Sequence, residues 1–243
     1  MKTIILFLLL FSIQDIEYKF GKPTTKGIDY YVDLHWFDFI EDFEASVQDS
    51  IFGLFISTDN LRGYEQHELG YFQPPNSIVV TNEERYIDYE LNMMSDFKKS
   101  QYRETNQFVR AIVMHEICHA YFYQLLKLCD KGDSLEYEFR LGLHIVPQDF
   151  YGTEFCEEGI CEYVVETMGE RIAYDEKVRI TANKLINNRN SYEVKYRYAS
   201  QFVKPIVDSL GIRNAILTIV SNKPPSNEEI LKPEFYYKRI RIK

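Results

Sequence analysis

Apolar residues follow a helical spacing over two stretches near the middle of the chain. The first, residues 107–128, contains no Gly or Pro and is apolar on nearly every side. Asn106 before it is a good helix N-cap, and a helix of this kind lies buried at the centre of a domain. The second stretch begins near Thr153 and continues through Met168. The pattern predicts two helices, the first of them in the core.

Shorter runs predict strands upstream and further helices downstream. Residues 51–57 (IFGLFIS) and 77–81 (SIVVT) are short and rich in apolar residues, as strands are. Residues 30–51 and 195–211 have helix-like spacing, whereas residues 131–151 are irregular. The order of elements therefore predicts an α+β fold, in which a small sheet packs on the central helix and a mostly helical C-terminal half follows.

The first residues resemble a leader rather than part of the domain. Lys2 precedes an apolar run from Ile4 to Ile13, the length of a signal-peptide core and too short to span a bilayer. We therefore predict a signal peptide over residues 1–14 and export to a periplasmic or secreted location, with membrane association through the N-terminus or a cytoplasmic location as alternatives. A small-x-small cleavage site is not obvious, so a buried first strand or helix stays open.

The remainder predicts one domain over residues 15–243, with the sheet in the part up to about residue 128 and helices from about residue 152. Hydrophobic residues make up 45% and aromatic residues 15% of the chain, which is enough for a core and argues against disorder. The net charge is −9 and no basic stripe occurs before the C-terminus, so nucleic acid is not an expected partner. No segment after the N-terminus is long and apolar enough to predict a transmembrane helix.

The cysteines do not form a recognisable metal motif. The chain has four, at positions 118, 129, 156 and 161, and none pair as CxxC, so a thiolate zinc site is not indicated. Cys118 and Cys161 fall inside the helical patterns, where cysteine is usually a small buried residue. A disulfide stays open if the protein is exported.

The motif that carries chemistry is HEICH, with His115, Glu116 and His119 on the central helix. Residues four apart project from the same helical face, so both imidazoles can bind one Zn²⁺ ion. Glu116 lies beside the first histidine, where it can take a proton from a water on the metal. The alternative is two core histidines bonded to polar neighbours.

A catalytic zinc ion needs a third protein ligand and an open position. A metzincin would supply a histidine from HExxHxxGxxH, but Phe122 and Leu125 stand at the glycine and last histidine positions. The other histidines are His35, His67 and His144, none in a matching pattern; His144 is the best of them because it lies between the two helices.

The second helix, with Phe155-Cys156-Glu157-Glu158-Gly159-Ile160-Cys161-Glu162-Tyr163, resembles that of the gluzincins, above all their aminopeptidase-like and minigluzincin-like branch. Those proteins have a helix of the form N-E-G-F-A-x-Y. Glu158-Gly159 and Tyr163 match this pattern, while Glu157 replaces the Asn and Cys161 takes the small-residue position. The resemblance covers about residues 75–211 and implies a zincin-like metallopeptidase fold.

The resemblance also implies roles for particular residues. Glu158 would be the third zinc ligand, with Glu157 as the alternative, and Glu162 would accept a hydrogen bond from a ligand histidine. Gly159 would let this helix approach the HEICH helix closely. Tyr196, with Tyr198 as its rival, would stabilise the oxyanion. The interval from His119 to Glu158, 158 − 119 = 39 positions, is longer than in that branch.

These features predict a zinc metallopeptidase that hydrolyses peptides or proteins. The absence of a G-x-M-E-N motif favours an endopeptidase over an aminopeptidase. In zincins an edge strand beside the active-site helix pairs with extended substrate, and the resemblance implies this role for the strand at residues 77–81. Its place and apolarity would equally suit a core strand. The alternatives are a catalytically inactive zincin-like scaffold that holds zinc, and a structural protein without metal.

Overall fold

The computed structural model describes residues 36–51, 54–59, 70–73, 77–81, 105–129, 151–168 and 177–242. The predicted signal peptide over residues 1–14 and the irregular stretch at 131–150 lie outside these residues. So do three of the histidines: His35, His67 and His144.

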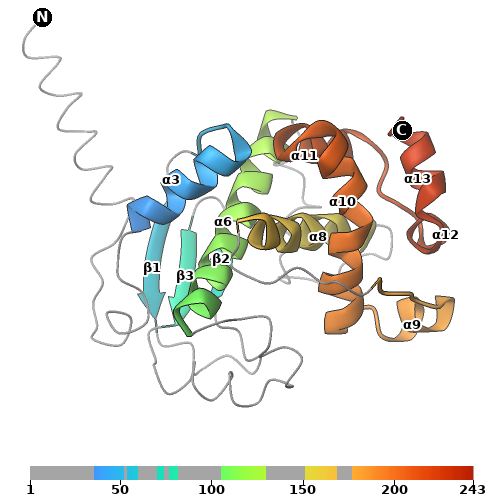
Figure 1. The fold of residues 1–243 in the computed structure, drawn as a ribbon, viewed down its shortest axis with the longest axis horizontal. Coiled ribbons are helices and arrows are strands. Elements are labelled where there is room, and N and C mark those ends of the chain that lie inside the picture. Colours follow the sequence, from blue (N-terminus) through green and yellow to red (C-terminus); the bar gives the residue numbers. More distant parts are fainter. Residues whose placement is uncertain are drawn as a thin grey trace, which may run out of the picture.

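The described residues of the N-terminal part form one helix and a three-stranded sheet (Figure 1). The helix is α3 (Trp36–Val47), and the strands are β1 (Phe55–Asp59), β2 (Gly70–Gln73) and β3 (Ser77–Thr81). The order is β1-β3-β2, with β1 parallel and β2 antiparallel to β3. The sheet is therefore mixed, and β2 lies at the edge of its described part.

Two strand predictions need correction. Residues 77–81 do form a strand, but β3 is the central strand and not the edge that we expected. The predicted strand at 51–57 begins later, at Phe55. The sequence patterns missed β2 altogether, since four residues are too few to establish an alternation. The antiparallel partner of β3 thus comes from a segment whose sequence shows no strand pattern.

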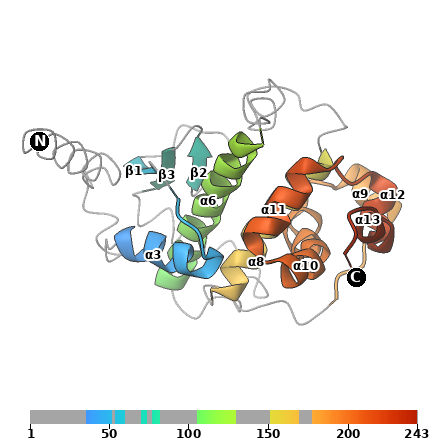
Figure 2. The same ribbon diagram turned by 90° about the horizontal axis from the view of Figure 1, so that it is seen from above.

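The central helix α6 (Thr105–Leu128) is confirmed almost to the residue. It contacts β2 and β3 on one side and α8 (Tyr151–Thr167) and α11 (Ile212–Ser221) on the other (Figure 2). Because neighbours surround it, Val113, Met114 and Ile117 are all fully buried. The helix is apolar on nearly every side and is buried by its neighbours, which confirms the prediction that it lies in the core.

The C-terminal half is helical. A π-helical turn, η4 (Glu193–Tyr198), leads directly into α10 (Ala199–Leu210), which ends at Gly211 with a left-handed φ of 74°. Three short helices complete it: α9 (Ala182–Asn187), α12 (Asn227–Leu231) and α13 (Pro233–Arg239).

The glycine of the second helix has a different neighbour from the one expected. A Cβ at Gly159 would overlap the backbone carbonyl of Ala199, at the start of α10, and the three atoms nearest to it all belong to Ala199. The expectation that Gly159 brings α8 close to the HEICH helix is therefore wrong. The residue instead permits the close packing of α8 against α10.

The described chain is thus mostly helical with a small sheet, which confirms the α+β class in general. Among the described helices, none has the length and apolarity needed to cross a bilayer.

Candidate metal centre

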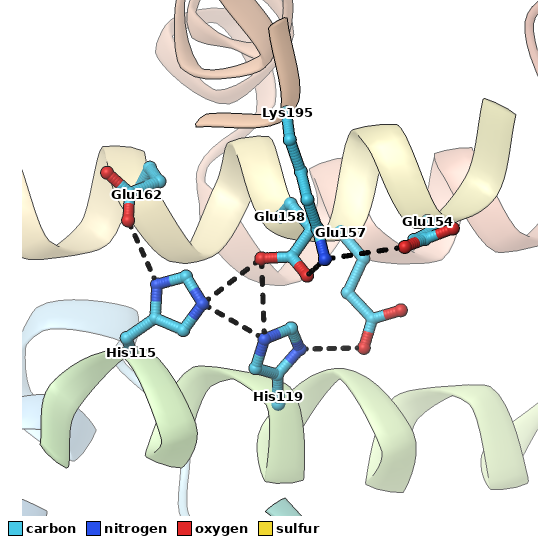
Figure 3. A network of polar contacts seen from close by, with 7 residues as sticks. All are labelled: His115, His119, Glu154, Glu157, Glu158, Glu162 and Lys195. Atoms are coloured by element: carbon cyan, nitrogen blue, oxygen red, sulfur yellow. Dashed lines mark hydrogen bonds and ion pairs between the residues drawn. The ribbon is translucent and has the colours of Figure 1, made fainter. Parts of the chain in front are cut away.

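The helix α6 brings three polar side chains to one place in the core. His115 and His119 are one turn apart and face α8 (Figure 3). Their Nε2 atoms are 3.0 Å apart. Glu116 is buried on the same turn. The helical period alone produces this arrangement, because residues i and i+4 share a face.

Glu158 of α8 completes a triangle of donor atoms. Its Oε2 lies 3.2 Å from Nε2 of His115 and 3.7 Å from Nε2 of His119. Ligand atoms about 2.0–2.2 Å from a tetrahedral zinc ion lie about 3.3–3.6 Å from one another. The separations of 3.0, 3.2 and 3.7 Å bracket that range, so the three residues fit the group.

The outer ring nitrogens of both histidines are held by separate carboxylates. Nδ1 of His115 lies 3.1 Å from Oε1 of Glu162, and Nδ1 of His119 lies 2.9 Å from Oε1 of Glu157 (Figure 3). Such a contact fixes the tautomer that carries its proton on Nδ1 and leaves Nε2 free to bind a metal. The structure therefore places Glu162 where we expected it, and places Glu157 on an orienting contact rather than in the ligand triangle.

Glu158 is kept ionised in this buried position. Burial alone would raise the pKa of its carboxyl, but the charge of Lys195 and the contacts with both histidines hold that pKa well below its usual range. Nζ of Lys195 lies 2.9 Å from Oε1 of Glu158. The carboxylate is thus an anionic group that can bind a metal ion at neutral pH.

The pKa values of both histidines are shifted upward in the absence of a metal. Burial would lower the pKa of His115, but the hydrogen bond and charge of Glu158 raise it above 6.5. Burial opposes protonation of His119 too, yet the bond to Glu157 and the nearby carboxylates raise its pKa. A metal ion bound here competes with protons, which makes its affinity dependent on pH.

Glu116, the candidate general base, is buried between the two histidines and β2. Burial raises the pKa of its carboxyl, the histidines lower it, and the backbone N–H of Phe72 in β2 donates a hydrogen bond to it. The net shift of the Glu116 pKa is upward, and a raised pKa makes a carboxylate a stronger proton acceptor. The strand β2 thus lies directly beside the candidate base.

The two candidate tyrosines, Tyr196 and Tyr198, lie in different surroundings. The ring of Tyr196, on η4, lies edge-on to His115 with 6.1 Å between centroids. Tyr198 faces the other way, and its hydroxyl donates to the carbonyl of Ile230 at 2.6 Å. Of these two tyrosines, Tyr196 is the one beside the histidines of the candidate centre, whereas Tyr198 packs against Phe155.

Cys161 is a nearby sulfur donor that the sequence patterns did not indicate. Its Sγ and one nitrogen from each of His115 and His119 lie within 4.8 Å of one another, so these three residues could hold a metal ion. Burial, the neighbouring Cys118 thiol and the charges of Glu157 and Glu158 all raise the pKa of the Cys161 thiol. Because the thiolate is the binding form, Glu158 is the better prepared third ligand.

Sequence reasoning missed Glu157 as an orienting group, Cys161 as a neighbour, and Lys195. The helical period could have indicated Cys161, which follows Glu158 by three residues on the same face. Lys195 has no local signal, since its contact depends on how η4 packs against α8. All four cysteines of the chain are described and carry free thiols.

Comparison of the chain with protein-family models, with curated proteins and with solved structures found no significant match in any of the three.

Proposed function

We propose that this chain is a zinc-dependent metallopeptidase of the gluzincin type that cleaves internal peptide bonds. The proposal rests mainly on one observation: three donor atoms from His115, His119 and Glu158 converge, and each histidine has its outer nitrogen held by a further glutamate. A core pair of histidines satisfied by polar neighbours has no need of this convergence. Converging donor atoms on histidines whose outer nitrogens are held by carboxylates are typical of a catalytic metal site.

In the proposed reaction a zinc ion, when bound, supplies a Lewis acid that polarises the scissile carbonyl and lowers the pKa of water. Glu116 accepts the proton of the attacking water and delivers it to the leaving amine. Tyr196 donates a hydrogen bond to the carbonyl oxygen as negative charge develops there. The intact Glu116 favours an enzyme over a scaffold that only stores zinc, since a scaffold needs no base.

The substrate would lie along β2. This strand is at the edge of the described sheet, and its Phe72 contacts Glu116 through the backbone. An extended peptide that adds to such an edge is held by main-chain hydrogen bonds, with little demand on its sequence. β2 therefore takes the substrate-pairing role that the sequence analysis gave to residues 77–81.

The test combines metal content with peptide cleavage. We expect about one zinc per wild-type chain, and hydrolysis of a fluorogenic peptide blocked at both ends. Glu116→Gln and Tyr196→Phe should keep the zinc, with turnover reduced by about 10²-fold or more, because each loses a group that acts in the transition state. Glu228→Gln, at an exposed position on α12, and Tyr198→Phe serve as matched controls that retain turnover.

Three outcomes would contradict parts of the proposal. A wild-type chain that takes up no zinc after its addition would refute the metallopeptidase. Zinc without hydrolysis of any peptide would leave the zinc-binding scaffold. Cleavage only of peptides with a free N-terminus would make the protein an aminopeptidase.

A further inference from the structure

Lys195 makes a contact with the candidate metal centre that the proposed mechanism does not use. Its Nζ lies 2.9 Å from Oε1 of Glu158 and 3.4 Å from Oε1 of Glu154, and 24% of its side chain is exposed (Figure 3). The lysine comes from η4, the same π-helical turn that carries Tyr196. Single π turns of this kind occur frequently at functional sites. Here the turn brings two consecutive side chains to the face of α8.

The two oxygens of Glu158 have different partners. Oε2 faces Nε2 of both histidines, at 3.2 and 3.7 Å, whereas Oε1 is engaged by the ammonium of Lys195. A free carboxylate can bind a metal through one oxygen or through both. An oxygen already paired with a lysine at 2.9 Å is a weaker second ligand, because the ammonium competes with the metal for its negative charge.

The geometry points to Lys195 as a positioning residue that holds Glu158 to one-oxygen coordination of the metal. This inference rests on the proposed metal site and deepens it. By withholding Oε1, the lysine leaves a coordination position open, which is what separates a catalytic zinc site from a closed structural one. The ion pairs of Lys195 with the described residues are to Oε1 of Glu158 and Oε1 of Glu154, and not to Oε2 of Glu158 or to either histidine.

The ammonium of Lys195 also lowers the affinity of the site for a metal ion. The inference therefore predicts the direction in which metal affinity changes when Lys195 is replaced. A positive ammonium a few ångströms from a divalent cation repels it. Replacing Lys195 by the similarly sized, uncharged Met removes that repulsion and frees Oε1. We therefore expect Lys195→Met to bind the metal at least about tenfold more tightly, because the repulsion between a unit charge and a dication has this size even in a water-like dielectric. A merely structural lysine predicts the opposite, because its loss would disorder Glu158 and weaken binding.

The experiment uses Co²⁺ in the full-length protein, with affinity by titration and visible absorption as a readout of coordination number. Wild type should show the intense bands of four-coordinate Co²⁺. Lys195→Met should bind more tightly, with weaker bands, as Glu158 chelates through both oxygens. Lys195→Arg keeps the charge and the hydrogen bond, and should restore the wild-type spectrum and affinity. Lys204→Met is the matched control, since Lys204 pairs with Asp208 at 3.1 Å on the exposed side of α10.

The outcomes separate the two proposals. Wild-type spectra and affinity in Lys195→Met, or weaker binding in both Met and Arg variants, would overturn the positioning role while leaving the metal site intact. Failure of the wild-type protein to bind Co²⁺ or Zn²⁺ would overturn both. If Lys195→Met does not fold, Lys195→Arg still tests the inference, because loss of the four-coordinate spectrum in a variant that keeps the charge and the bond refutes it.

Discussion

Three side chains of α8 near the histidines could each be taken for the third ligand. Glu158 presents Oε2 to both Nε2 atoms, Glu157 contacts Nδ1 of His119 rather than Nε2, and burial and nearby charges raise the pKa of the Cys161 thiol. Adjacent residues on a helix point about 100° apart, so Glu157 and Glu158 cannot both enter the same triangle. Which of the two glutamates faces the Nε2 atoms is therefore decided by the rotation between adjacent residues of α8.

Zinc content of three variants tests that assignment. Glu158→Ala should lose most of the metal, because a ligand is removed. Glu157→Ala should retain it with affinity about 10–100-fold lower, since only the orienting contact is lost. Cys161→Ser should bind zinc as wild type does. Elemental analysis after dialysis gives the result; zinc retained in Glu158→Ala and lost in Cys161→Ser would transfer the ligand role to the sulfur.

At the scale of elements, α8 is the helix on which the centre depends. It contacts α6 on one side, where Glu158 meets the histidines, and α10 and η4 on the other. Gly159 allows the second of these contacts, because its missing Cβ leaves room for the carbonyl of Ala199. Gly159, next to Glu158, thus allows α8 to lie close to α10 and to η4, which leads into it. Lys195 and Tyr196 both lie on η4.

Gly159→Ala tests this packing. In an ordinary helix interior the change would stabilise by about 1 kcal/mol. Here we expect a loss of about 1–3 kcal/mol, because the new methyl group meets backbone that cannot move aside. Chemical denaturation of the metal-free protein measures the change. Gly70→Ala, whose nearest contact is the side chain of Ile112 at 2.9 Å, should lose less; a gain in stability for Gly159→Ala would refute the close packing.

For the whole molecule, the centre lies between α6, which supports the sheet, and the helical C-terminal half (Figure 2). A metal bound by His115, His119 and Glu158 therefore links the two parts and stabilises the folded state over the unfolded one. How much it stabilises depends on pH, since both histidines must lose their protons to bind it.

The sign of this pH dependence follows from the histidine shifts. The pKa values of His115 and His119 are raised above 6.5, so their contribution to metal-free stability is complete below that pH and is lost as pH rises through the raised values. Zinc binding has the opposite dependence. The difference in Tm between zinc and EDTA samples should therefore widen from about pH 5.5 to about pH 8.5; a constant difference would contradict the assignment of these histidines as ligands.

Much of the centre could be predicted from the sequence. The length of α6, its burial and the common face of His115 and His119 follow from local spacing and composition. Glu158, Glu162 and Tyr196 came from a resemblance to known helices, and the structure brings all three to the histidines. Local patterns succeed here because a helix repeats its geometry every few residues, whatever surrounds it.

The sequence by itself thus determined the central helix, the histidine pair and the position of Glu116 beside it, since these depend on contacts within one turn. Only the tertiary structure decided that β3 is central and β2 is the edge, that Gly159 meets Ala199 rather than α6, and that Lys195 reaches Glu158. Strand order and contacts between helices join residues far apart in the chain. Their outcome depends on how whole surfaces pack, and no short stretch of sequence encodes it.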